Sequence, residues 1–433
     1  MKRIKVLKNA IWIIGCKIIK AILTLIVTMI TARYLGPSNY GLISYAASLV
    51  TFVTPLMKLG LDSTLVYELV NNPKDEGKIL GSTLLMCFVS GILCLIGIIT
   101  FVSLVNAGEK DTLIVCSLYG VLLIFQAFEM IQYWFQAKLL SKYCSISMLL
   151  SYVIITLFQL YLLITSKSVY WFALSYSIDY LLISIFLIFF YKKNGKSKFK
   201  FSKKTFSKLL KNSKYYIISS MMVTIFAQTD KVMLKLMINN KAVGYYSAAV
   251  TCANMLAFVF AAVIDSIRPT VYEAQKESKM KFENRMIQMY SIIIYFSLFV
   301  SLFITIFSPL IIKILYGNSY TESIPALRLI VWYTTFSYLG TIRNVWIIAV
   351  NKQKHLWKIN LSGALLNIIL NSFLIPLYGI MGAAFASLMT QIFTNFIIGF
   401  IIKDIKDNNK LMVKSLNPMI LIHIFENMLP RKI

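Results

Sequence analysis

The chain has 433 residues, of which 58% are hydrophobic and 14% charged, and its formal net charge is +27. A soluble domain carries about 25% charged residues, so this composition excludes an ordinary soluble protein. The basic residues lie in short segments between apolar runs, which excludes the single basic footprint of a nucleic-acid-binding protein.

The apolar runs predict about twelve transmembrane helices, because about 20 apolar residues suffice to cross a bilayer. The first run continues from Ala10 to about Ile30 without a small-residue cleavage pattern, so we interpret it as an uncleaved span. The first six predicted helices cover residues 10–32, 39–61, 79–105, 112–135, 145–165 and 169–191. The second six cover residues 214–237, 242–265, 286–314, 324–350, 358–376 and 379–402. An all-α, polytopic membrane fold is therefore predicted.

Lysine and arginine fall almost entirely on one side of these spans. About 32 lie in the N-terminus, in alternate loops and in the tail, against about five on the other side. Segment 192–214 is the richest of these regions in lysine. Since cytoplasmic loops carry such an excess, the pattern predicts that both termini are cytoplasmic.

The two halves of the chain resemble each other at a shift of about 203 positions. Gly41 then matches Gly244, and Asp62 matches Asp265. Two halves of six spans each share one orientation, so they are parallel repeats related by an axis along the membrane normal. We therefore predict an N-terminal lobe (1–191), a basic cytoplasmic linker (192–213), a C-terminal lobe (214–402) and a cytoplasmic tail (403–433).

Four predicted helices carry polar side chains on one face, at steps of three and four residues. They are the first two helices of each half, so we expect their polar stripes to line one shared cavity. Cations outnumber carboxylates in these stripes, which favours an anionic substrate such as a pyrophosphate head group. The candidate substrate-binding residues are Lys17, Lys20, Arg33, Lys58, Lys231, Lys235, Arg268 and Arg343. The candidates for ion coupling or gating are Asp62, Glu129, Asp179, Asp230 and Asp265.

Each of these assignments has a structural alternative. Lys17 and Lys20 lie near a helix end and could extend their ammonium groups to the interface. The charged residues near the cytoplasmic mouth could be gate pairs or solvated helix ends, and Asp230 with Lys231 could form a structural ion pair. The cysteines and histidines have no metal-binding spacing, so we expect no metal and no cofactor other than a coupling ion, H⁺ or Na⁺.

A series of short motifs gives a family resemblance. They are ARYLGPSNYG (32–41), QTDKVML (228–234), VGYYSAA (243–249), LYG (315–317) and GIMGAA (379–384). Together they resemble the O-antigen flippase (Wzx) branch of the polysaccharide transporter family. That family lies within the multidrug/oligosaccharidyl-lipid/polysaccharide exporter superfamily, which includes the MATE transporters.

The resemblance implies two six-helix lobes around a V-shaped cavity, in the inner membrane of a bacterium. It implies a non-enzymatic flippase that moves an undecaprenyl-pyrophosphate-linked oligosaccharide from the cytoplasmic to the outer leaflet by alternating access. The cargo would be an O-antigen, capsular or exopolysaccharide repeat unit, and an ion gradient is the expected drive. Membrane lipids are expected contacts, and the polysaccharide polymerase machinery is a candidate partner.

Two other functions remain open. A cation-coupled exporter of drugs or other small molecules, from the same superfamily, would require an acidic cavity for cationic substrates. A membrane enzyme such as a glycosyltransferase would require paired carboxylates or a large extramembrane loop. The sequence has no Walker motif, so we expect no direct use of ATP.

Overall fold

The computed structural model describes the backbone of residues 2–195 and 197–421, and the side chains of 20, 22–195, 197–218 and 220–421. Within this part of the chain the secondary structure is helical, without strands, which confirms the predicted all-α fold. The longer N-terminal helices are α1 (Lys2–Lys58), α3 (Glu76–Val105), α4 (Lys110–Gly120), α7 (Ser141–Ile164), α8 (Val169–Asn194) and α9 (Lys203–Met237). The longer helices that follow are α10 (Asn240–Ala253), α11 (Ala257–Glu277), α12 (Lys279–Tyr316), α13 (Ser323–Ala349) and α14 (Leu356–Ile392).

Shorter elements join these helices. In the N-terminal half they are η1 (Leu61–Ser63), α2 (Leu65–Asn71), η2 (Pro73–Asp75), α5 (Leu122–Gln126), η3 (Ala127–Met130) and α6 (Ile131–Ala137). In the C-terminal half they are η4 (Asn318–Tyr320), η5 (Gln353–His355), the π-helical turn η6 (Phe393–Ile397), α15 (Ile398–Ile401), η7 (Lys403–Ile405) and α16 (Lys406–Lys414).

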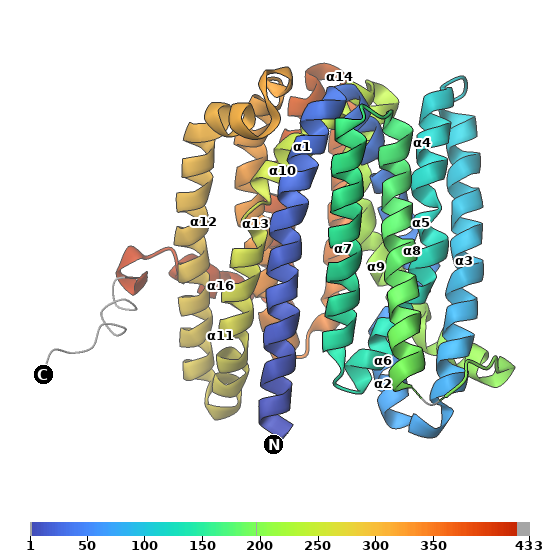
Figure 1. The fold of residues 1–433 in the computed structure, drawn as a ribbon. Coiled ribbons are helices and arrows are strands. Elements are labelled where there is room, and N and C mark those ends of the chain that lie inside the picture. Colours follow the sequence, from blue (N-terminus) through green and yellow to red (C-terminus); the bar gives the residue numbers. More distant parts are fainter. Residues whose placement is uncertain (1, 196, 422–433) are drawn as a thin grey trace, which may run out of the picture. The chain divides into compact units, whose positions relative to one another are not determined.

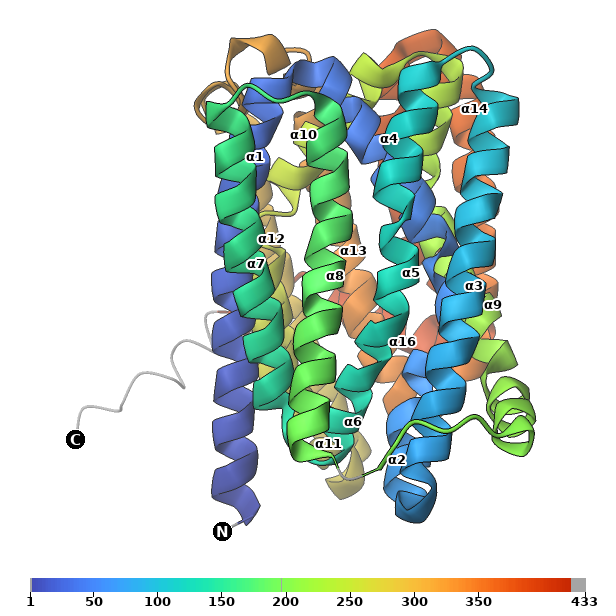
Figure 2. The same ribbon diagram turned by 45° about the vertical axis from the view of Figure 1, so that its right-hand side comes forward.

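Two of the long helices contain a sharp break at a glycine. α1 has 57 residues, about 85 Å if straight, whereas the hydrocarbon core of a bilayer is about 30 Å thick. It breaks at Gly36, with φ 70° and ψ 171°, and Pro37 excludes helical geometry at that position. Figure 2 shows α1 rising from the N-terminus and descending again towards α2. α14 breaks in the same way at Gly379, so each helix supplies two predicted spans.

The span count follows from these breaks. Within the described residues, eight helical segments are long and apolar enough to cross a membrane, or nine if α10 and α11, bent by 41°, form one span. α1 and α14 are each counted once among these segments, although each breaks at a glycine into two predicted spans. α13 is not among them, because its arginines and hydroxyl residues make it less apolar, but it is long enough to span. The fold is therefore consistent with the twelve predicted helices (Figure 1).

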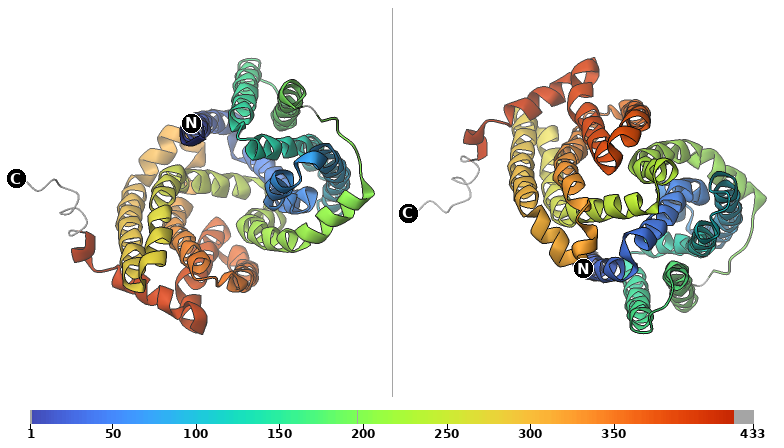
Figure 3. Two further views of the ribbon diagram at one scale, coloured as in Figure 1. Left: turned by 90° about the horizontal axis from the view of Figure 1, so that it is seen from below. Right: turned by 90° about the horizontal axis from the view of Figure 1, so that it is seen from above.

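The chain forms two compact units, residues 1–244 and 245–433 (Figure 3). In unit 1, α9 packs against α1 and α3. The predicted linker is partly helical, because α9 begins at Lys203, and the carboxylates Glu68 and Glu76 hold it through Lys208 and Ser197. The two lobes that the internal repeat predicts, residues 1–191 and 214–402, remain a prediction.

Each unit has its own core and its own apolar exterior. Tyr45 and Phe135 are fully buried in unit 1, as are Tyr290 and Tyr316 in unit 2. Large apolar side chains on several long helices are exposed instead: Leu93, Leu157, Phe299 and Leu310 are examples. Such a surface requires lipid rather than water as its solvent.

The second half of α1 crosses the start of α10 at very short range. A Cβ atom on Gly41 would lie 1.8 Å from the carbonyl oxygen of Asn240, and one on Gly244 would lie 1.9 Å from that of Pro37. These two glycines are the pair that the predicted repeat matches. Each of the two segments thus lacks a side chain where the other approaches it.

Candidate functional site

A cavity of about 500 Å³ opens in unit 1 where two helices are interrupted. α1 ends at Lys58, followed by Leu59 and Gly60 with φ of 51° and 63°. The span built from α4, α5 and α6 changes to a 3₁₀ turn at Ala127–Met130. The lining residues are Ala47, Val50, Thr51, Thr54, Pro55, Lys58, Gly60, Asp62, Tyr119, Leu122, Gln126, Tyr180, Ser220, Val223 and Thr224. Interrupted spans beside a cavity are typical of substrate sites in transporters.

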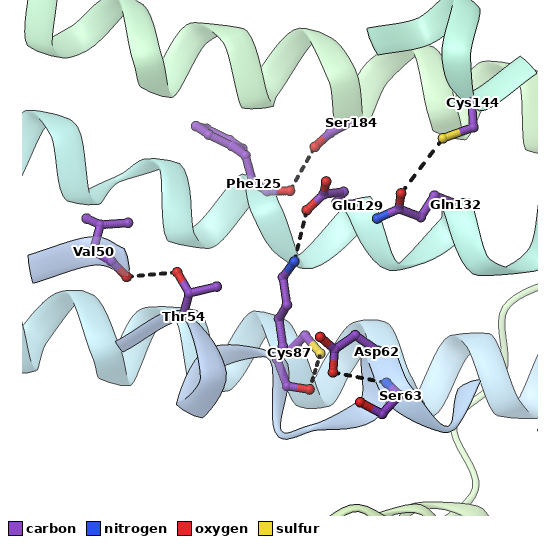
Figure 4. Close-up of polar contacts among 11 residues, drawn as sticks. Val50, Thr54, Asp62, Ser63, Cys87, Phe125, Glu129, Gln132, Cys144 and Ser184 are labelled. Carbon is purple, nitrogen blue, oxygen red and sulfur yellow. Dashed lines mark hydrogen bonds and ion pairs between the residues drawn. The ribbon is translucent and has the colours of Figure 1, made fainter. Parts of the chain in front are cut away.

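Lys58 and Glu129 form an ion pair beside this cavity, across the two interruptions (Figure 4). The Lys58 Nζ atom lies 3.4 Å from Glu129 Oε2, and the two side chains are 17% and 14% exposed. Glu129 belongs to the 3₁₀ turn η3, and Ser184 Oγ of α8 lies 2.8 Å from the carbonyl oxygen of Phe125 just before that turn. A hydroxyl from a neighbouring helix thus stabilises the interruption that positions Glu129.

The remaining polar groups of the cavity suit a ligand rich in hydroxyls. The hydroxyls of Thr51 and Thr54 donate to the carbonyls of Ala47 and Val50, so they can only accept from a ligand. Gln126 is buried, and its Oε1 atom has no hydrogen-bond partner among the described residues. Asp62 Oδ1 accepts from the backbone N–H of Ser63 at 3.0 Å.

The structure thus brings together part of the predicted stripes. Of the named candidates, Lys58 and Asp62 line one cavity, with Glu129 beside it. Thr51, Ser220 and Thr224, polar residues of the same predicted helices, line it too. Sequence reasoning missed Tyr119, Gln126 and Tyr180. Gln126 lies three residues before Glu129 in an apolar run, and this spacing could have indicated it.

The other candidates on α1 and α8 lie elsewhere in unit 1. Lys20 Nζ lies 5.6 Å from the centre of the Tyr152 ring, a cation–π geometry. Asp179 accepts a hydrogen bond of 2.6 Å from Ser151 Oγ. Arg33 is exposed near the break of α1, and the Lys17 side chain lies outside the described residues.

A second cavity, of about 830 Å³, lies at the α3–α4 connection and includes one of the three candidates on α9. Lys235 lines it and pairs with Glu109 at 2.5 Å, whereas Asp230 is buried and Lys231 half-buried outside both cavities. Partial burial raises the pKa of Glu109, but the hydrogen bonds from Lys235 and Thr112 outweigh it and hold that pKa below its ordinary value. This second cavity carries both charges on its wall and is not strongly cationic.

The candidates of unit 2 form local contacts. Arg268 and Asp265 pair at 2.8 Å on the exposed side of α11. Arg343 is buried and donates to the carbonyl oxygen of Thr394, within the π-helical turn η6. A π turn leaves a carbonyl to be satisfied from outside the helix, so this arginine has a structural role in addition to any other.

Comparison with known proteins identifies the family of this chain. A family model described as "Polysaccharide biosynthesis protein" matches residues 6–275, which is more than half of the chain. This chain belongs to the polysaccharide biosynthesis protein family. The predicted resemblance is thereby confirmed at the level of the family.

An uncharacterised membrane protein of Methanocaldococcus jannaschii is 26% identical over 234 residues, which make up 51% of this chain and 45% of that relative. The chain thus matches less than half of the length of this relative.

Solved structures of other transporters show a similar fold. The lipid II flippase MurJ, in an inward closed conformation, is 16% identical with a TM-score of 0.74, covering 95% of this chain and 92% of its own. An inward-facing MATE family multidrug resistance transporter of the MOP superfamily is 13% identical with a TM-score of 0.71, covering 91% and 95%. At these identities the likeness concerns the fold.

Proposed function

We propose that this member of the polysaccharide biosynthesis family is a flippase for an undecaprenyl-pyrophosphate-linked oligosaccharide, which it moves from the cytoplasmic to the outer leaflet. The observation that carries the proposal is the cavity at the two helix interruptions, which offers one ammonium group, Lys58, among hydroxyl and amide side chains. An ammonium group can bind a diphosphate, and amides and hydroxyls suit sugars. The family match and the flippase and exporter folds of the solved relatives support the same reading.

In this proposal Lys58 binds the head group, while Thr51, Thr54 and Gln126 contact the first sugar. The other predicted substrate-binding cations, Lys17, Lys20, Arg33, Lys231, Lys235, Arg268 and Arg343, stay proposals for contacts made at other stages of the cycle. An H⁺ or Na⁺ gradient is the proposed drive, and Asp62, Asp179, Asp230 and Asp265 stay candidates for the coupling or gating residue. The inner membrane, with cytoplasmic termini, is the proposed location, and the polysaccharide polymerase machinery stays a proposed partner.

A second candidate function is a cation-coupled exporter of small molecules. It is favoured by the two carboxylates near Lys58, Asp62 and Glu129, because acidic side chains in a cavity suit a cationic substrate. The MATE-like fold also supports this candidate.

The deciding experiment is translocation in proteoliposomes. A fluorescent undecaprenyl-pyrophosphate oligosaccharide is incorporated, a proton or sodium gradient is imposed, and accessibility of the probe to an external quencher is followed. We expect gradient-dependent exposure that is faster than in empty liposomes and is lost in Lys58→Met. The exposed variant Lys276→Met serves as the matched control and should behave as the wild type. If the head group is never exposed while an organic cation is exported, the exporter function is correct instead.

A further inference from the structure

Glu129 differs from three other carboxylates of unit 1, Glu68, Glu76 and Asp179, in how loosely it is held. Glu76 accepts hydrogen bonds from Trp134 and Ser197, and Glu68 accepts from Lys208 and Asn212. Asp179 is likewise bonded to a serine hydroxyl. Glu129 Oε2, in contrast, is buried without a hydrogen-bond partner among the described residues, and its contact with Lys58 is 3.4 Å long. Electrostatic attraction to one ammonium group is therefore the main contact that fixes this oxygen.

The pair connects two segments that can each adjust. Lys58 is the last residue of α1, directly before two residues with positive φ, and Glu129 lies in a 3₁₀ turn between two short helices. Other ionisable groups close enough to act on this region electrostatically are Asp62, Cys87, Tyr133, Cys144, Asp179 and Tyr180. None of these is a cation. Lys20 acts electrostatically on Asp179, and the cation that pairs with Glu129 is Lys58.

We propose that Glu129 is an internal counter-ion that occupies Lys58 while the cavity is empty and is displaced when an anionic head group binds. This inference rests on the proposed function. An ammonium group in a poorly solvated site needs an anion beside it, and the nearby carboxylate supplies one until the diphosphate arrives. Two consequences follow. Glu129 lowers the affinity for the head group, and it promotes release of the head group on the far side by returning to Lys58.

Binding of farnesyl pyrophosphate, a short-chain pyrophosphate lipid, to the purified full-length protein in detergent tests this competition. Glu129→Gln removes the charge and nearly preserves the shape, so we expect it to bind about fivefold or more tightly than the wild type. Lys58→Met should lose binding. The double variant Lys58→Met, Glu129→Gln should bind as weakly as Lys58→Met alone, because without the Lys58 ammonium group there is no cation for which Glu129 and the lipid compete. Glu76→Gln is the matched control, the same substitution at a buried carboxylate that accepts hydrogen bonds from Trp134 and Ser197, and it should bind as the wild type does.

A transport measurement separates competition from a purely structural role. In proteoliposomes, Glu129→Gln should slow net translocation, because the empty protein returns with an unpaired ammonium group. Exchange of labelled for unlabelled lipid across the membrane should be retained, because it does not require the empty protein to return. Equal or weaker binding by Glu129→Gln, with the wild type binding normally, would overturn the inference. A folded wild type that binds no pyrophosphate lipid would overturn the proposed function itself.

Discussion

Lys235 and Glu109 form an ion pair whose two members are solvated very differently. The Lys235 side chain is 4% exposed and that of Glu109 45% exposed. Removing one member of a buried pair costs about 3–5 kcal/mol, and the exposure of the carboxylate reduces this for the present pair. The cost should also depend on which member is removed. Removing the carboxylate leaves a buried lysine, whereas removing the lysine leaves a carboxylate that is exposed to solvent.

We predict that Glu109→Gln lowers the free energy of unfolding by about 1–3 kcal/mol, because it leaves a buried ammonium group without an anion. Lys235→Met should cost less, about 1 kcal/mol or below, because the carboxylate left behind can hydrate. Thermal unfolding of both variants in one detergent measures the difference. A larger loss for Lys235→Met would show that the lysine is held by something other than this pair.

The same pair predicts a dependence of stability on pH. The folded-state pKa of Glu109 lies below its ordinary value of 4.5, so its stabilising contribution is fully present above pH 4.5. It is lost as the pH falls through the lower, folded-state pKa. The melting temperature of the wild type should therefore fall faster than that of Glu109→Gln below pH 4.5, and parallel curves would contradict this.

At the level of helices, the crossing of α1 and α10 depends on the absence of two side chains. A Cβ atom at Gly41 or Gly244 would collide with backbone, which cannot move aside as a flexible side chain can. We therefore predict that Gly41→Ala and Gly244→Ala each reduce the yield of folded protein and translocation severalfold. Gly97→Ala is the matched control, because that helical glycine has open space around its Cβ position and alanine favours a helix. Size-exclusion profiles and the proteoliposome assay compare the three variants, and normal behaviour of both crossing variants would contradict the close contact.

The helices also show which secondary-structure elements could be predicted from local sequence. The apolar runs were sufficient to predict two helices, 10–32 and 39–61, on either side of the break that the structure places at Gly36. The helix α16 was missed, because it is only nine residues long and half of its buried face consists of asparagines, Asn408 and Asn409, beside Leu411 and Met412. Both asparagines have hydrogen-bond partners inside the fold. Tyr290, 118 residues away, donates to Asn408, and Asn409 donates to the carbonyl of Phe396 on the preceding π-helical turn, and neither contact is visible in the sequence.

For the whole molecule, charge distribution and span count together predict the orientation in the membrane. We expect Lys110→Cys, at the start of α4, to react with a membrane-impermeant maleimide in intact cells. Lys198→Cys, between α8 and α9, should react only after the cells are permeabilised. Both positions are exposed, and the described cysteines are buried or half-buried, which keeps their background low. The reverse labelling pattern would invert the predicted topology.

The fold class and the family were predictable at this scale, since both rest on features repeated along the whole chain. The site was predictable only in part. Thr51 and Lys58 lie seven residues apart on α1, and a period of 3.6 residues places them on one face of that helix. Asp62 lies beyond the end of the helix, in η1, and reaches the same cavity through the irregular turn. The pairing of Lys58 with Glu129 was not predictable, because it joins residues 71 positions apart across two irregular turns, and no local pattern specifies such contacts.

The contact between Gly41 and Gly244 has a consequence for how such a chain could have arisen. If the two halves descend from one duplicated gene, the ancestor was a homodimer in which both positions were encoded by a single codon. Replacing that glycine would have introduced two side chains into the crossing at once, whereas after gene fusion the two glycines could change one at a time. In relatives where one of the two is replaced, we therefore expect the compensating change to be found in the opposite half, among the residues matching Pro37 or Asn240.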